Sequence, residues 1–430
     1  MKISATVHYE IRRNTWLLFA AQAMMSTGLS MASQLGSLII YALTQSKSLA
    51  GLPMALHYVA IAAVAYPAGR FMDRRGRRPG LVLGYIIAGV GAAVVAAAVS
   101  GHVFAAYLIG LVVLSLGAGM GQLTRAAVAD MYPVERRAGA VGLVVAGGLV
   151  GGITGPGLVA LGDRIAPALG ADPLAIPYAI LVIALILAAA TASRLRPDPR
   201  EISQRLSEYF PATGAGEVSP APASRATVGE IVGSRPAQAA MIALACAQAA
   251  MAMLMATSSL MMHLHGHSIN AISLALMSHV LGMFGLSVPI GRLADRVGRT
   301  PVLIGGALLT ASSGLVFTLG VESAVVSSVA FYLVGLGWSL TFVAGAALLG
   351  DLSGPATRAR VMGINDLFTS MTAMTAALLG GVFLARGGET TVGVMAATLG
   401  SIPLLAILRA GRAMGPRPAV AAAAAVGDGK

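Results

Sequence analysis

The residues best suited to chemistry in this 430-residue chain are ionisable groups that lie within long apolar runs. Asp366 is the one acid inside a predicted membrane span, about 8 Å from the end of its helix, with Asn365 beside it. A carboxyl group at this depth is expensive to desolvate, so it is a candidate for function. It predicts a proton carrier, and the alternatives are that Asp366 caps the helix end or pairs with an arginine such as Arg358 or Arg360.

Two histidines occupy matching positions in the chain. His57 and His279 each stand twelve residues before a Gly-Arg pair, which places both near mid-membrane on a helix. They predict either protonatable groups that contact a solute or packing residues that are hydrogen-bonded inside the protein. Trp338 is a further candidate for contact with a solute, although a packing role explains it equally well.

The first apolar run carries polar residues at helical spacing while its other faces are apolar. This pattern predicts a helix that lines a polar cavity, and hydrogen bonding between helices is the alternative. The residues of the stripe are Gln22, Ser26, Ser30, Ser33 and Ser37.

Metal and cofactor chemistry receive little support. His263, His265 and His267 have a spacing that could share a metal, but no acid or thiol accompanies them, so we expect interfacial histidines and no metal site. The chain has no phosphate-binding loop and no His-Glu-x-x-His motif, so we expect neither a cofactor nor an enzyme. Cys246 is the one cysteine, which leaves no intramolecular disulfide.

The elements that must position these residues are membrane helices. With 57% apolar and 11% charged residues, the composition excludes a soluble multidomain enzyme, and the 53 glycines suit close packing of helices in a bilayer. Twelve apolar runs are long enough to cross a membrane, which predicts an all-α membrane protein. The runs are 14–41, 50–71, 80–100, 103–127, 138–161, 174–192, 237–262, 269–291, 302–320, 324–349, 361–385 and 391–408.

The distribution of basic residues predicts the orientation. With the first span entering from the cytoplasm, the outer loops hold only Lys47, Arg164 and Arg386 of the 29 Lys and Arg residues. Both termini are therefore expected in the cytoplasm, with the chain in the cell membrane. The net charge of +12 is explained by topology, so we expect no nucleic-acid partner.

The longest polar stretch divides the spans into two groups of six. We expect an N-terminal bundle at 1–193, a cytoplasmic linker at 194–235, a C-terminal bundle at 236–412 and a disordered tail at 413–430. Four linker residues share one helical face and predict either a short interfacial helix or a solvated segment. They are Ile202, Leu206, Tyr209 and Phe210.

The chain contains an internal repeat at 221 to 222 residues, which indicates duplication. The clearest copy is a short basic segment, in which Asp73 aligns with Asp295, and Asp130 further along aligns with Asp351. The segment from Gly69 to Arg78 resembles the signature loop between spans two and three of the Major Facilitator Superfamily, and its copy from Gly291 to Arg299 resembles the counterpart loop.

The resemblance implies two pseudo-symmetric six-helix bundles that rock about a central cavity. Its loop motifs imply a gate in which Asp73, among arginines, forms an ion-pair latch that breaks as the bundles move. The alternative is that these arginines only enforce topology. The implied gate residues are Gly69, Asp73, Arg74, Gly76, Arg77, Gly291, Asp295, Arg296, Gly298 and Arg299.

The fifth span resembles the antiporter motif of the same superfamily. It keeps the spacing of Gly142, Gly151, Gly155 and Pro156, but Val159-Ala160 replaces the terminal glycine pair, and close packing of glycines is the alternative. In the fourth span, Leu111 stands where many drug/proton antiporters have an arginine.

Short motifs around His279, Trp338 and Asp366 look like a prokaryotic branch of the superfamily in which a few members are described as riboflavin transporters. The resemblance implies a secondary transporter for a small organic solute that acts as a monomer by proton-coupled efflux. The alternatives are an uptake permease for a vitamin-like nutrient and a non-transporting membrane sensor.

Overall fold

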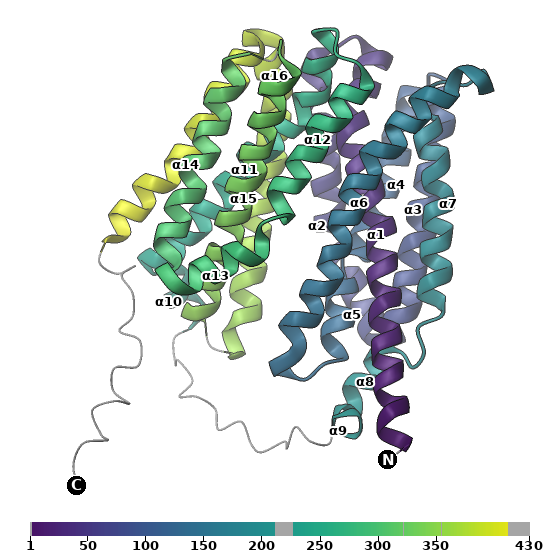
Figure 1. Cartoon of the computed structure of the whole chain (residues 1–430), viewed down its shortest axis with the longest axis vertical. Helices are drawn as coiled ribbons and strands as arrows, with labels where there is room; N and C mark the ends of the chain where they lie inside the picture. Colours follow the sequence, from purple (N-terminus) through teal and green to yellow (C-terminus); the bar gives the residue numbers. More distant parts are fainter. Residues whose placement is uncertain (1, 211–226, 321, 354, 412–430) are drawn as a thin grey trace.

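The computed structural model describes residues 2–210, 227–320, 322–353 and 355–411. Its long helices run side by side in two groups, one purple to teal and one green to yellow (Figure 1). The predicted tail at 413–430 and the middle of the predicted linker, 211–226, lie outside the described residues. We call the end that holds α8 and the start of α1 the lower end, and the opposite end the upper end.

The first group is the N-terminal bundle. Its helices are α1 (Lys2–Thr44), η1 (Lys47–Leu49), α2 (Leu52–Arg75), α3 (Arg77–Ser100), α4 (Phe104–Gly121), α5 (Thr124–Asp130), α6 (Val134–Leu169) and α7 (Ile176–Ser193). Two short helices follow, α8 (Pro199–Gln204) and α9 (Leu206–Tyr209).

The second group is the C-terminal bundle. Its helices are α10 (Val228–Gly233), α11 (Arg235–Leu264), α12 (Ile269–Phe284), α13 (Ser287–Val297), α14 (Arg299–Thr318), α15 (Ala324–Leu352) and α16 (Pro355–Ala410). Gly388 interrupts α16 with a φ of 65°, so α16 holds two successive spans.

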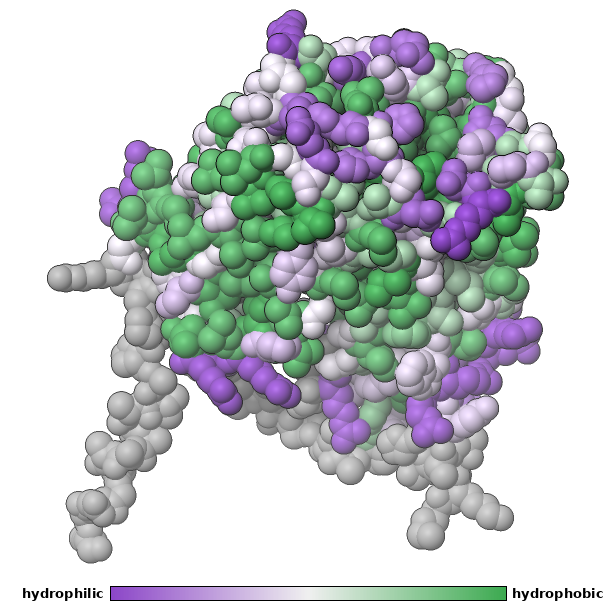
Figure 2. Space-filling view, turned by 45° about the horizontal axis from the view of Figure 1, so that its top comes forward, coloured by the Kyte–Doolittle hydropathy of each residue, from purple (hydrophilic) through white to green (hydrophobic). Residues whose placement is uncertain are grey.

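The predicted all-α membrane protein is confirmed. Ten stretches of the described helices are long and apolar enough to cross a bilayer, the last of them Arg360–Ala410. That last stretch contains two spans, which makes eleven. The twelfth is α1, which is not among the ten because its polar stripe breaks its apolar run. The described helices thus account for the twelve predicted spans. Figure 2 shows a band of apolar surface between two hydrophilic zones, as a bilayer requires.

Two predicted spans are not continuous helices. The fourth breaks at Gln122 and Leu123, and the eighth breaks at Gly285 and Leu286. At the first break, the Thr124 hydroxyl donates to the carbonyl of Gly121 over 2.5 Å. At the second, the Ser287 hydroxyl donates to the carbonyl of Phe284 over 2.9 Å. In both cases the hydroxyl of the residue that begins the second helix bonds to the carbonyl of the residue that ends the first.

The start of the linker packs on the N-terminal bundle. The face predicted from Ile202, Leu206, Tyr209 and Phe210 belongs to α8, α9 and the residue that follows. Ile202 and Phe210 are buried in the apolar core of that bundle, and the ring of Phe210 lies 6.1 Å from that of Tyr132. The apolar face is therefore covered by protein.

Candidate functional site

The two bundles are joined mainly through their upper halves. Gln34 on α1 donates a buried hydrogen bond of 2.8 Å to the hydroxyl of Ser273 on α12. Nearby, a side chain at Gly51, the residue before α2, would overlap the carbonyl of Ala377, so the chain at the start of α2 touches the backbone of α16. Along α2, exposed side chains are rare between residues 52 and 61 and frequent from 62 to 75. The bundles are therefore closed above and separated below.

A chain of polar and aromatic groups crosses the middle of the interface. The indole of Trp338 on α15 donates to Gln248 on α11 over 2.7 Å, and Gln248 donates to the hydroxyl of Tyr58 on α2 over 2.8 Å. Phe342, which is 45% exposed, stacks on Trp338 with ring centroids 4.8 Å apart. Sequence analysis found Trp338 but missed Gln248, although a glutamine in an apolar helix was the available signal.

Below this level, Asp366 is exposed on α16. The buried Asn365 donates to its carboxylate over 3.3 Å. The charge of Arg125, on α5 of the other bundle, interacts with that of Asp366, although these two described side chains form no direct ion pair. Arg125 was missed by sequence analysis, which considered Arg358 and Arg360 instead. The side chain of Arg358 lies outside the described part of the structure, and that of Arg360 is exposed.

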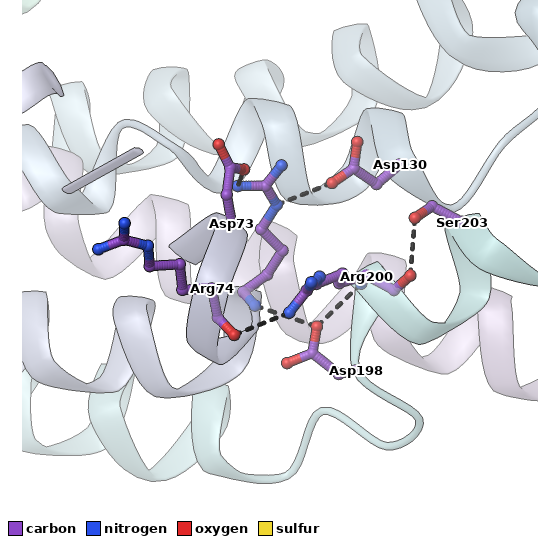
Figure 3. A network of polar contacts seen from close by, with 7 residues as sticks. Asp73, Arg74, Asp130, Asp198, Arg200 and Ser203 are labelled. Atoms are coloured by element: carbon purple, nitrogen blue, oxygen red, sulfur yellow. Dashed lines mark hydrogen bonds and ion pairs between the residues drawn. The ribbon is translucent and has the colours of Figure 1, made fainter. Parts of the chain in front are cut away.

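The two predicted gate segments adopt the same local structure. Arg77 contacts Asp73 and Asp130, each at 2.8 Å. In the other bundle, Arg299 contacts Asp295 at 2.6 Å and Asp351 at 3.4 Å. Each cluster therefore consists of one arginine between two aspartates of its own bundle, drawn for the first bundle in Figure 3. Their role as gates stays a prediction, and the names first gate and second gate refer to these two clusters.

The glycines of the gates differ in their surroundings. Gly76 and Gly298 have φ angles of 104° and 93°, which favour glycine, and each precedes the arginine of its gate. A side chain at Gly69 or Gly291 would meet open space in this structure. The remaining gate residues, Arg74 and Arg296, are exposed.

A linker residue that sequence analysis missed holds the first gate in place. The Asp198 carboxylate accepts hydrogen bonds from the backbone nitrogens of Arg77 and Arg78, at 3.0 and 2.9 Å, and from that of Arg200 at 2.8 Å. The Arg200 guanidinium donates to the carbonyl of Arg74 over 2.9 Å (Figure 3). The sequence feature that could have revealed this residue is an aspartate directly before Pro199, since Asp commonly caps a helix that begins with proline.

The structure buries each of the matching histidines inside its own bundle. His57 and the hydroxyl of Ser115 share a hydrogen bond of 3.0 Å. His279 donates to the carbonyl of Phe331 over 3.1 Å. The two rings are thus held by separate partners, and the neighbour of the first histidine, Tyr58, makes the contact between bundles.

The glycines of the predicted antiporter motif bring α6 against α1. Side chains at Gly151 and Gly155 would overlap backbone atoms of α1, whereas Gly142 faces open space. Pro156 lies inside α6, next to Gly155. The serine stripe of α1 contributes to this contact, since Ser30 donates to the carbonyl of Gly152 over 3.1 Å.

Gln22 and one of the three neighbouring histidines, both singled out in the sequence, have polar partners. Gln22 donates to Ser26 one turn along α1 over 3.1 Å, and its carbonyl oxygen is buried without a partner. At the upper end, His265 lies 3.1 Å from Glu389. Within the described residues, no group of three or more potential metal ligands is present.

The similarity to known proteins includes both bundles. The sequence profile of the Major Facilitator Superfamily matches residues 17–268 and 240–426. The uncharacterised MFS-type transporter YdeG of Bacillus subtilis (strain 168) is 30% identical over 379 residues, which cover 87% of this chain and 86% of YdeG. The riboflavin transporter RfnT of Brucella anthropi is 28% identical over 383 residues, which cover 89% of this chain and 91% of RfnT.

A solved structure shows the same fold. The xylose transporter XylE from E. coli, in a partially occluded inward-open conformation, superposes with a TM-score of 0.71 at 14% identity, covering 93% of this chain and 98% of XylE. Because the sequence match includes both bundles and the duplicated loops resemble the signature of this family, the chain belongs to the Major Facilitator Superfamily of transporters.

Proposed function

We propose that the chain is a proton-coupled secondary transporter that exports a small, ring-bearing organic solute across the cell membrane. The observation that carries this proposal is the interface itself, which is closed above and separated below, with polar and aromatic groups at the level where the separation begins. Such an arrangement suits alternating access, with both termini in the cytoplasm and one chain forming the whole pathway.

The proposed substrate class rests on the aromatic pair. Phe342 stacks on Trp338 at an interplanar angle of 9° and is partly exposed, so a planar ring can extend the stack. Gln248 and Tyr58 supply hydrogen-bonding groups beside it. The relative RfnT is a riboflavin transporter, which supports a heterocyclic solute for this chain as well.

The proposed coupling uses Asp366 and Arg125. When Asp366 is ionised, attraction to Arg125 draws the lower halves of the bundles together, because the two charges lie on opposite bundles. Protonation of Asp366 removes this attraction and favours separation of the lower halves. In this cycle a proton from outside binds Asp366 and is released into the cytoplasm as the solute binds. Entry of the proton is thus exchanged for exit of the solute.

Export is supported by the glycine contacts of α6, where the antiporter-like motif lies. Uptake of a vitamin-like nutrient is the second candidate, and it is favoured by the match to RfnT over 89% of this chain. Energised whole-cell accumulation separates the two, because an exporter lowers the cellular content of the solute and a permease raises it.

The first test is pH-gradient-driven flux in proteoliposomes, with riboflavin and cationic and anionic drugs as solutes. We expect Asp366→Asn to abolish proton-coupled flux. Asp163→Asn, which removes an acid elsewhere, should retain it. Coupled flux that survives in Asp366→Asn would exclude Asp366 as the carrier. Absence of flux for every ring-bearing solute would contradict the substrate class and favour the sensor alternative.

A further inference from the structure

A cavity separate from the transport pathway lies at the lower end of the N-terminal bundle. It has a volume of about 460 Å³ and is bounded by α1, α3 and the residues that follow α7. Its lining consists of Arg13, Leu17, Arg78, Ser193, Arg194 and Arg196. Four of these six residues are arginines and none is acidic. Arg13, Arg78, Ser193 and Arg196 also line an adjoining cavity of about 870 Å³, whose acids are Glu10, Asp198 and Glu201.

The four arginines lack carboxylate partners. In the part of the chain that the structure describes, none of them forms an ion pair with Asp or Glu. Arg13 donates to the carbonyl of Arg196 over 2.5 Å, but its Nε is buried without a hydrogen-bond partner. Since clustered guanidinium groups repel one another, the cavity is suited to an anion that accepts several hydrogen bonds.

The cavity is placed at the level of lipid headgroups. Tyr9, Arg13 and Trp16 follow one another along one face of α1, and the two aromatic side chains are 56% and 53% exposed. Exposed Tyr and Trp near a helix end are typical of the interface between a membrane and water. Leu17 continues the lining toward the apolar part of α1, so the cavity joins a basic end to an apolar one.

We propose that this cavity binds the phosphate group of an anionic membrane phospholipid. The arginines donate hydrogen bonds to the phosphate oxygens, and the acyl chains extend past Leu17 into the bilayer. Free inorganic phosphate shares the headgroup chemistry, but it would leave the apolar side of the cavity unused. The bound lipid joins α1 and α3 to the segment that leads to Asp198, so it braces the linker that holds the first gate.

The test uses protein that has been purified in detergent and freed of lipid. Dihexanoylphosphatidylglycerol, dihexanoylphosphatidylcholine and inorganic phosphate are titrated separately by calorimetry, with thermal unfolding as a second readout. We expect the anionic lipid to bind and to raise Tm, and the zwitterionic lipid and inorganic phosphate to do neither.

Arg78→Gln combined with Arg194→Gln removes two charges from the cavity without removing any side-chain hydrogen bond of the described residues. We expect affinity for the anionic lipid to fall roughly 30-fold, since each arginine near an anionic lipid contributes about a factor of five. Arg235→Gln combined with Arg409→Gln removes two exposed arginines elsewhere and should leave the affinity unchanged.

Three results would overturn the proposal. They are equal affinity for both lipids, unchanged affinity in the cavity variant, and binding of inorganic phosphate as tight as that of the anionic lipid, which would indicate a soluble-anion site. Should the double glutamine variant fail to fold, Arg78→Lys combined with Arg194→Lys keeps the positive charges but loses the planar guanidinium groups with their paired N–H donors. An intermediate loss of affinity in that variant is then the expected result.

Discussion

At the scale of single residues, the two gates use the same three side chains but are stabilised unequally. Arg77 is 16% exposed and contacts both aspartates at 2.8 Å, whereas Arg299 is 26% exposed and its second contact is 3.4 Å long. Exposed ion pairs contribute little on their own. The first gate has the additional support of Asp198, which fixes the turn at the start of α3.

Replacing Asp198 should loosen the first gate. In Asp198→Ala, α3 loses a charged cap at its N-terminus, and we expect a loss of about 1–2 kcal/mol in stability. Residues 194–210 should also exchange their amide hydrogens faster, because the variant releases the linker from Arg77 and Arg78. Thermal unfolding and hydrogen exchange measure the two effects. Glu201→Gln, on the same linker, is the control, and equal exchange in both variants would contradict the role of Asp198.

The ion pairs of Arg77 and Arg299 could be anticipated because their Asp and Arg residues recur in both halves of the sequence. Asp198 and Arg125 could not be found in this way, because neither belongs to the repeated motif. Their partners, Arg77 and Asp366, come from segments more than a hundred residues away. Such contacts depend on how the helices pack, which hydropathy and charge do not determine.

At the scale of elements, the spans were predictable from apolar length, but their interruptions were not. The breaks before Thr124 and Ser287 lie inside apolar runs, so a hydropathy pattern does not report them. Glycine spacing was a better guide. It singled out Gly151 and Gly155, which contact α1 in the structure, although the same motif includes Gly142, which makes no such contact.

This difference within one motif gives a prediction for α6. In Gly151→Ala, the added methyl group overlaps the carbonyl of Ala23 and forces α1 and α6 apart, which we expect to cost about 1–3 kcal/mol. In Gly142→Ala, the methyl group enters open space, and the better helix propensity of alanine should raise stability by up to about 1 kcal/mol. Thermal unfolding in one detergent compares them. Shifts of the same sign would show that close packing does not decide the role of these glycines.

At the scale of the whole molecule, the fold follows from the sequence but the conformation does not. Twelve spans and a duplicated loop motif imply two bundles, whichever end of the pathway is open. The structure shows one state, in which hydrogen bonds between described residues join the bundles at Gln34–Ser273 and Tyr58–Gln248. Alternating states of a transporter differ by a few kcal/mol, so small differences in contacts select between them.

The observed state predicts opposite accessibility for two engineered cysteines. Ser37 is 2% exposed near the upper contact, whereas Ala65 is exposed on the lower half of α2, on the face that carries Tyr58. With Cys246→Ser as background, we expect a maleimide to label Ala65→Cys rapidly and Ser37→Cys slowly.

Adding Gln34→Ala removes the hydrogen bond to Ser273 at the upper contact. A net loss of about 1 kcal/mol should shift the population toward the upper-open state roughly fivefold. Labelling of Ser37→Cys should then rise while that of Ala65→Cys falls, because opening one end closes the other. A rise at both positions would instead indicate general loosening of the bundles, and it would contradict Gln34 as a contact that selects between the two states.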